Sequence, residues 1–294
     1  MKRINTILSA LVALFAVALF VSCHRVGHNE KVLVVSIQPQ KYLLQQIVGN
    51  KYNVKSLLTQ KGNPETYEPS ASNLVSIENS DAYFKIGNIG FELAVSPSIA
   101  SLNPDLKIYD TSKGVDMIVG SHCTGGYHDH NKRVIDVDPH IWSSAVNSKV
   151  IAKNMYDAML EIDEKNAKYY TKNFNKLIER LDSIDTAIRE ILPQDGSRSF
   201  LVWHPSLSYF ARDYNLHQVS LEAIGKESSV KNFKERLDFA KSDSIHIFLY
   251  QKEFDSRQAD IILKDMDVRK FEINPMNYDF GEELINTAYA IASK

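Results

Sequence analysis

A long amphipathic segment in the middle of the chain is the feature that most constrains its fold. Between Asp163 and Pro193, apolar residues recur at three- and four-residue spacing: Tyr170, Phe174, Leu177, Ile178, Leu181, Ile184 and Ile188. This spacing predicts a helix that is capped by Asp163 and stops at Leu192-Pro193. About 28 residues at ~1.5 Å each form a rod of roughly 42 Å, far longer than an average helix. A coiled coil is the alternative, but strands are expected directly afterwards, so we interpret the segment as a strut between two domains.

The residues before this helix alternate between short apolar runs and helical patterns. Residues 31–37 form a β-branched run, as in strands that are buried on both faces. A helix is predicted from Pro39 to the stop signal Gly49-Asn50. Further strands are predicted at residues 52–59, 82–86, 106–109 and 134–137. The alternation predicts an N-terminal α/β lobe over residues 31–145 with a mainly parallel sheet.

The same plan returns after the long helix. Strands are predicted at residues 199–202, 217–221, 245–250 and 268–273, and helices at residues 205–214, 230–241, 256–264 and 281–292. Residues 194–294 are therefore expected to form a second α/β lobe, with residues 146–193 as the helical connection. The predicted fold class is α/β, with two lobes of mainly parallel sheets joined by one long rigid helix.

The start of the chain is predicted to be a targeting signal rather than part of the fold. Lys2 and Arg3 precede an apolar run, residues 7–21, which as a helix would span only about 22 Å against a hydrocarbon core of ~30 Å. A cleaved signal peptide over residues 1–22 is therefore favoured over a permanent anchor. Ser22-Cys23 resembles a bacterial lipoprotein box, so we expect Cys23 to carry lipid and residues 23–30 to form a tether. A buried thiol is the alternative.

Charge and cysteine content exclude several classes of protein. The chain has 34 Lys+Arg against 36 Asp+Glu, without the basic excess of a nucleic-acid binder. Its two cysteines cannot form a disulfide framework. The chain also lacks the paired C-x-x-C spacing of a zinc finger.

A short histidine tract lies between Gly120 and Lys132. It contains His122, His128 and His130 in a stretch with several glycines. Short His-rich tracts chelate divalent metals weakly, so an auxiliary metal loop is expected here, with a solvated loop as the alternative.

Three polar segments follow predicted strands, where ligands bind in open parallel sheets. Glu65, His140 and His204 each lie next to a proline in one of these segments. Imidazole nitrogens and carboxylate oxygens are suitable ligands for zinc and related divalent ions, and distant segments must converge to complete a shell. A single histidine at such a position is more often a packing or capping residue. Together, however, the three segments indicate a divalent-metal site.

Five motifs of the chain, in the expected order, resemble those of metal-binding lipoproteins of ABC transporters, the zinc and manganese class of extracytoplasmic solute-binding proteins. The similarity covers residues 31–294. The motifs are Gly62–Pro69, Asp138–Ser143, His204–Phe210, Glu222–Glu227 and Gln251–Phe254. The resemblance implies two α/β lobes joined by a long helix, with the metal ion in the cleft between them.

The resemblance also implies a set of ligands. His140 and His204 fall where the family has ligands, and so does Glu65, although the family more typically has histidine there. A carboxylate at this position makes the site harder and less exclusively zinc-like. The usual fourth ligand is an acid near the last strand. Asp279 is the nearest downstream acid, Glu222 is an outside candidate, and water can also complete the shell.

The function that this resemblance implies is high-affinity capture of a divalent metal ion in the bacterial cell envelope and its delivery to an ABC transporter permease. Zinc is favoured, with Mn²⁺ or Fe²⁺ as alternatives, and the chain is expected to be a monomer held at the membrane by its lipid. It is not expected to be an enzyme or to bind nucleic acid. One alternative is an envelope zinc hydrolase with Glu65 as general base, although H-E-x-x-H and G-x-S-x-G motifs are absent. Another is an adhesin or scaffold.

Overall fold

The computed structural model describes residues 30–119, 125–128, 134–192, 198–222, 230–243, 245–251, 263–264 and 266–293. From Lys31 onward, the described residues form one compact unit. The expected signal peptide and Cys23 lie outside the described residues, and most of the helix predicted at residues 256–264 does too. Among the described residues, no helix is both long enough and apolar enough to cross a membrane.

The N-terminal lobe contains a parallel sheet with the strand order β2-β1-β3-β4. Its strands are β1 (Val32–Val35), β2 (Asn53–Ser56), β3 (Ala82–Lys85) and β4 (Ile108–Asp110), and its helices are α2 (Gln38–Val48), α3 (Ala71–Glu78) and α4 (Gly90–Leu102). Leu33, Val34 and Val35 are fully buried, as the β-branched run predicts for a central strand. Pro39 lies in the first turn of α2, and Gly49 ends that helix with a positive φ of 55°.

The strand predicted at residues 134–137 is present but belongs to a separate sheet. It is β6 (Val134–Val137), and it pairs antiparallel with β5 (Gly125–His128) in a two-stranded hairpin. The apolar run predicted a strand but not its partner, which is an adjacent glycine-bearing segment. This hairpin leads directly into Asp138, whose backbone N–H donates to the carbonyl oxygen of Ile118.

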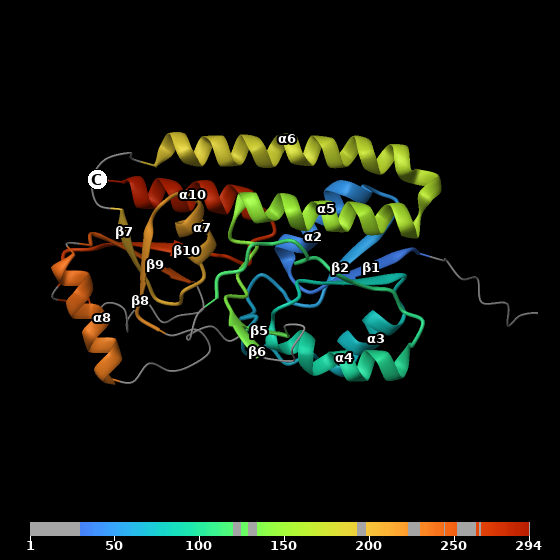
Figure 1. The fold of residues 1–294 in the computed structure, drawn as a ribbon, viewed down its shortest axis with the longest axis horizontal. Helices are drawn as coiled ribbons and strands as arrows, with labels where there is room; N and C mark the ends of the chain where they lie inside the picture. Colours follow the sequence, from blue (N-terminus) through green and yellow to red (C-terminus); the bar gives the residue numbers. More distant parts are fainter. Residues whose placement is uncertain are drawn as a thin grey trace, which may run out of the picture. The chain divides into compact units, whose positions relative to one another are not determined.

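Two antiparallel neighbours, α5 (Ala145–Ile162) and α6 (Ala167–Ile191), connect the lobes, with a short 3₁₀ turn over Glu164–Asn166. The predicted long helix is therefore present and has 25 residues. It packs against α2 and α5 and, further along, against α10 (Phe280–Ala292), as Figure 1 shows. The cap prediction was wrong, because Asp163 ends α5 instead of starting α6. Its buried carboxylate accepts a hydrogen bond from Tyr170 Oη at 2.9 Å.

The C-terminal lobe contains a second parallel sheet, with the strand order β10-β9-β7-β8. Its strands are β7 (Ser199–Val202), β8 (His217–Ser220), β9 (Ile247–Gln251) and β10 (Arg269–Ile273), and it also contains α7 (Ser208–Asp213) and α8 (Val230–Ser242). The predicted fold class is thus confirmed: two α/β lobes with parallel sheets are joined by a long helix.

One hydrophobic core extends through both lobes. It joins Leu33 of β1 to Leu249 of β9 through side chains of α6 such as Leu181 and Ile188. Because close-packed cores resist shear, the lobes are held in a fixed relation near α6. The ends of the strands on the opposite side are where a site between the lobes can form.

Candidate metal centre

Three loops bring Glu65, His140 and His204 together from distant parts of the chain. Glu65 follows β2, and its backbone N–H donates to Asn63 Oδ1 at 2.8 Å, which fixes the turn. His140 follows β6 and His204 follows β7. Both imidazoles are buried, and each precedes or follows a proline that restricts its loop. The structure brings these three predicted residues together beyond the ends of strands, although β6 belongs to the antiparallel hairpin.

The potential donor atoms of these residues form a small triangle. His204 Nε2 lies 3.4 Å from His140 Nε2 and 3.3 Å from Glu65 Oε1, and His140 Nε2 lies 3.8 Å from the same oxygen. A point equidistant from these three atoms is about 2.0 Å from each, which is the usual length of a Zn–N or Zn–O bond. Among the described residues, this is the one group of three or more His, Cys, Asp or Glu residues whose donor atoms lie close enough to hold an ion.

A second carboxylate lies on the Nδ1 side of each imidazole. Asp138 Oδ1 lies 2.8 Å from His140 Nδ1 and also accepts the backbone N–H of His140 at 2.9 Å. Glu222 Oε2 lies 3.7 Å from His204 Nδ1, while Glu222 Oε1 accepts a hydrogen bond from Trp203 Nε1. With Nδ1 engaged in this way, each ring presents Nε2 to the triangle. Such carboxylate–histidine pairs raise the basicity of a metal-binding imidazole and fix its ring.

The charges around the site favour a cation. Burial raises the pKa of Asp138, but the nearby His140 ring and hydrogen bonds to the carboxylate outweigh this and lower it below its usual value. Burial likewise lowers the pKa of His204, but Glu222 and Glu65 outweigh it and raise that pKa to about 9. At neutral pH a proton on His204 therefore balances the surrounding carboxylates when no metal is bound.

Two small cavities flank the triangle. One, of about 20 Å³, is lined from both lobes and includes His140, His204, Gln251 and Met276. The other, of about 130 Å³, lies beside Glu65 in the N-terminal lobe. Both volumes are far below those of typical pockets for organic ligands, so the space at the site suits one small ion better than an organic substrate.

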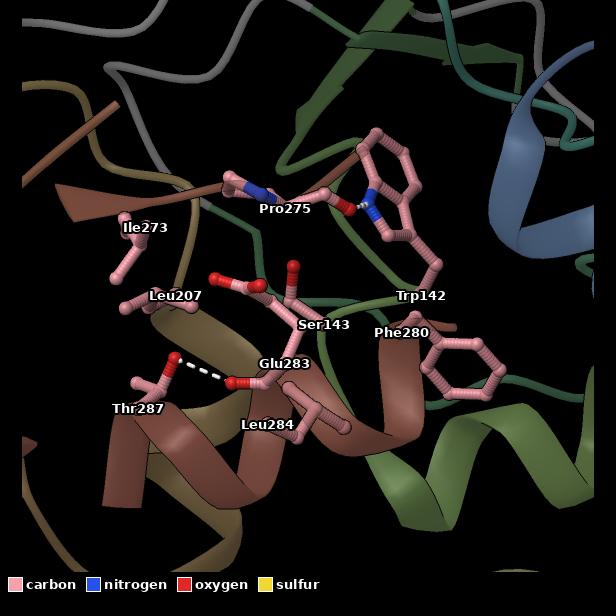
Figure 2. Close-up of a pocket in the computed structure, with 9 residues that line it drawn as sticks. All are labelled: Trp142, Ser143, Leu207, Ile273, Pro275, Phe280, Glu283, Leu284 and Thr287. Atoms are coloured by element: carbon pink, nitrogen blue, oxygen red, sulfur yellow. Dashed lines mark hydrogen bonds between the residues drawn. The ribbon is translucent and has the colours of Figure 1, made fainter. Parts of the chain in front are cut away.

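A hydrogen bond between the two lobes lies next to the site, and Figure 2 shows the residues around it. The indole N–H of Trp142 donates to the carbonyl oxygen of Pro275 at 2.9 Å, linking the loop of His140 to the loop after β10. Below that loop, Glu283 of α10 accepts the backbone N–H of Asn274 at 2.6 Å. Burial raises the pKa of Glu283. The segment Asn274-Pro275 is thus hydrogen-bonded to both lobes, to Trp142 of the N-terminal lobe and to Glu283 of α10.

The other predicted residues lie elsewhere. Asp279 caps α10, where its Oδ1 accepts the N–H of Glu282, and its Oδ2 lies 3.5 Å from Arg180. It does not belong to the cluster of donor atoms described above. Glu222 is adjacent to the site but faces the Nδ1 side of His204.

The auxiliary loop lies largely outside the described residues. His128 ends β5, whereas His122 and His130 are beyond the described ranges. Sequence reasoning assigned no role to Asp138 or Gln251. Asp138 could have been identified from its position two residues before His140, a spacing that lets one carboxylate contact both the ring and the backbone of the histidine. Gln251 begins the last of the five motifs that resemble those of the family and follows a predicted strand, but neither signal assigned it a role at the site.

Comparison with known proteins gives a consistent family. The family model described as zinc-uptake complex component A, periplasmic, matches residues 33–290. A putative metal-binding protein of Chlamydia muridarum is 28% identical over 90% of each chain. The zinc-binding lipoprotein AdcA of Streptococcus pneumoniae is 28% identical over 94% of this chain, but the match spans only 56% of AdcA. A crystal structure of a ZnuA deletion mutant with zinc bound has a TM-score of 0.80 at 29% identity, covering 89% of this chain and 96% of that one.

Proposed function

The chain belongs to the family of periplasmic zinc-uptake components, and we propose that Glu65, His140 and His204 bind the Zn²⁺ ion that it delivers to an ABC transporter permease. The observation that carries this assignment is the triangle of donor atoms. The distances between these atoms leave room for one ion at about the length of a Zn–N bond from each of them. The oriented imidazoles and the surplus of carboxylates support it. Zn²⁺ is the cargo in this proposal, and Mn²⁺ or Fe²⁺ is the alternative.

Metal analysis of the full chain, purified without added metal, tests this function. We expect about one tightly held zinc per chain, because the described residues contain one group of donor atoms that can bind an ion. Titration of the stripped protein with Zn²⁺, Mn²⁺ and Fe²⁺ then ranks the three ions. Protein that retains no divalent metal and binds none of the three in competition with a chelator would contradict the proposal.

Glu65 sets the preference among metals in this proposal. Exchange of the hard carboxylate for a borderline nitrogen in Glu65→His should shift the Zn²⁺/Mn²⁺ affinity ratio towards zinc by about tenfold or more. Competition titrations of both proteins with the two ions measure the ratio. Glu68→His, in the same loop, is the matched control and should leave the ratio unchanged. An unaltered ratio in Glu65→His would make Glu65 a bystander and direct the search for the third donor to Glu222, Asn274 or Asp279.

Water, rather than Asp279, is favoured as the fourth ligand. Asp279 already caps a helix and faces Arg180, so moving its carboxylate to the ion would give up both contacts. A water-completed shell also leaves the ion exchangeable for delivery. The long helix and the shared core favour release by small loop movements over a wide hinge opening.

We further propose that Cys23 carries the lipid that holds the protein at the cell envelope. Its position after an apolar run and Ser22 supports this. Cys23→Ala should give either an uncleaved form, which is longer by residues 1–22 and keeps their apolar run, or a soluble form that moves from the detergent phase to the aqueous phase. Cys123→Ala is the control and should partition as the parent does. A cleaved Cys23→Ala protein that partitions as the parent does would refute the lipid assignment.

The tract from His122 to His130 is proposed to be an auxiliary metal loop. The register of β5 and β6 places only the Gly125 end of this tract beside Val137, which precedes Asp138 and His140, whereas His128 pairs with Val134 at the far end of the hairpin. This separation from Glu65, His140 and His204 supports an auxiliary role. Deletion of residues 122–130 should lower the metal stoichiometry, or capture at low metal concentration, while preserving the tight site. Equilibrium dialysis at two zinc concentrations measures both properties. Complete loss of tight binding would show that the loop contains the main site.

A further inference from the structure

Gln251 is a buried polar residue beside the metal centre that the ligand set leaves unused. It is the last residue of β9 and is 2% exposed. Its Nε2 donates to Ser206 Oγ at 2.8 Å and lies 3.3 Å from the carbonyl oxygen of His204. Because that carbonyl can only accept, the amide nitrogen must face it, and this fixes the orientation of the side chain.

The other end of the amide has a different environment. In the part of the chain that the structure describes, Gln251 Oε1 is buried and has no hydrogen-bond partner. A buried amide oxygen without a partner costs about 1–3 kcal/mol, so such an atom usually has a ligand or water to accept from. Gln251 also lines the cavity of about 20 Å³ that both imidazoles border. That volume is close to the space that one water molecule needs.

We propose that Gln251 Oε1 accepts a hydrogen bond from the water molecule that completes the shell of the bound ion. This inference rests on the proposed function of Glu65, His140 and His204. A metal ion polarises the O–H bonds of its water, so a fixed neutral acceptor next to that water strengthens binding without adding to the negative charge of Glu65, Asp138 and Glu222. Gln251 is then a positioning residue for the fourth ligand.

The neutrality of this acceptor has a chemical consequence. A carboxylate at the same place would draw a proton from the metal-bound water and produce the nucleophile of a hydrolase. The amide of Gln251 has no such basicity. It holds the water as a ligand, as befits a site that only carries its ion.

Two variants separate the two ends of the amide. Gln251→Met keeps the length of the side chain but removes both Oε1 and Nε2, whereas Ser206→Ala removes the partner of Nε2 and leaves Oε1 in place. We expect Gln251→Met to lower Zn²⁺ affinity by about 10- to 100-fold, the usual effect of losing an outer-sphere partner, and Ser206→Ala to lower it less than about threefold. Chelator competition measures both affinities on the full chain.

The visible spectrum of bound Co²⁺ reports on the ligands of the ion. This spectrum would stay unchanged in Gln251→Met if Gln251 only stabilised the fold. Loss of the held water should change the ligand-field bands of Co²⁺-loaded Gln251→Met but not those of Ser206→Ala. The thermal unfolding of both variants without metal checks that they fold. Equal affinity losses in the two variants with unchanged Co²⁺ spectra would overturn the inference, and so would wild-type affinity in Gln251→Met. Failure of the proposed function is distinct, because the parent protein would then bind no zinc.

Discussion

Replacing either imidazole of the triangle with alanine should lower Zn²⁺ affinity by roughly 100- to 1,000-fold. A full structural zinc shell is worth about 10–16 kcal/mol, so each of three or four donors accounts for about 3–5 kcal/mol. His140→Ala and His204→Ala would each remove one of the three proposed donors, whose mutual distances leave room for an ion at about 2.0 Å from each atom. Competition with a chromophoric chelator at fixed pH measures the loss.

His217→Ala is the matched control for these variants. His217 is an exposed histidine at the start of β8 in the same lobe as His204. It should retain parental affinity, which separates loss of a ligand from a general effect of removing an imidazole. If His140→Ala and His204→Ala both stay within threefold of the parent, the triangle is not the tight site.

The predictable part of this site is the part that lies next to strands. Glu65, His140 and His204 could be located because apolar runs identify strands, and the sequence order then gives the residues that follow them. The buried stripe of α6 was predictable for a similar reason, because it has the helical period.

Contacts between distant segments could not be predicted in the same way. The bond between Trp142 and Pro275 depends on how the two lobes pack, and no local pattern encodes that packing. The fate of Asp163 is a second example. A capping residue before an apolar stripe predicts a helix start. The carboxylate instead accepts hydrogen bonds from Lys31 Nζ at 3.3 Å and Tyr52 Oη at 3.4 Å, which belong to the distant N-terminal lobe. Tertiary hydrogen bonds of this kind override a local preference.

The affinity for zinc should rise steeply with pH, over a higher range than an ordinary histidine would give. The usual imidazole pKa of about 6.5 predicts that binding weakens as the pH falls through about 6–7. Glu222 and Glu65, however, raise the pKa of His204 to about 9 despite its burial. Zinc must then displace a proton from His204 at any pH below that value. The apparent affinity should therefore increase by about tenfold per pH unit between pH 6 and 8.5.

Two measurements check this pH dependence. Calorimetry in buffers of different ionisation enthalpy should show release of about one proton per zinc at pH 7. Glu222→Gln removes one of the two carboxylates that raise the pKa of His204, so its affinity should depend less steeply on pH. Glu235→Gln, which removes an exposed carboxylate of α8, is the control and should follow the parent. A parental affinity that is flat between pH 7 and 8.5 would contradict the raised pKa.

The raised pKa of His204 has the opposite effect on the stability of the metal-free protein, which should fall as the pH rises. A histidine whose pKa is higher in the folded than in the unfolded chain stabilises the fold fully below about pH 6.5, and this contribution is lost as the pH rises through about 9. The metal-free protein should therefore melt at a lower temperature at pH 8.5 than at pH 6.5, as far as His204 is concerned. Zinc binding reverses this trend, because the ion replaces the lost proton between the carboxylates. The difference in melting temperature between zinc-bound and metal-free protein should thus widen with pH, and Glu222→Gln should narrow it.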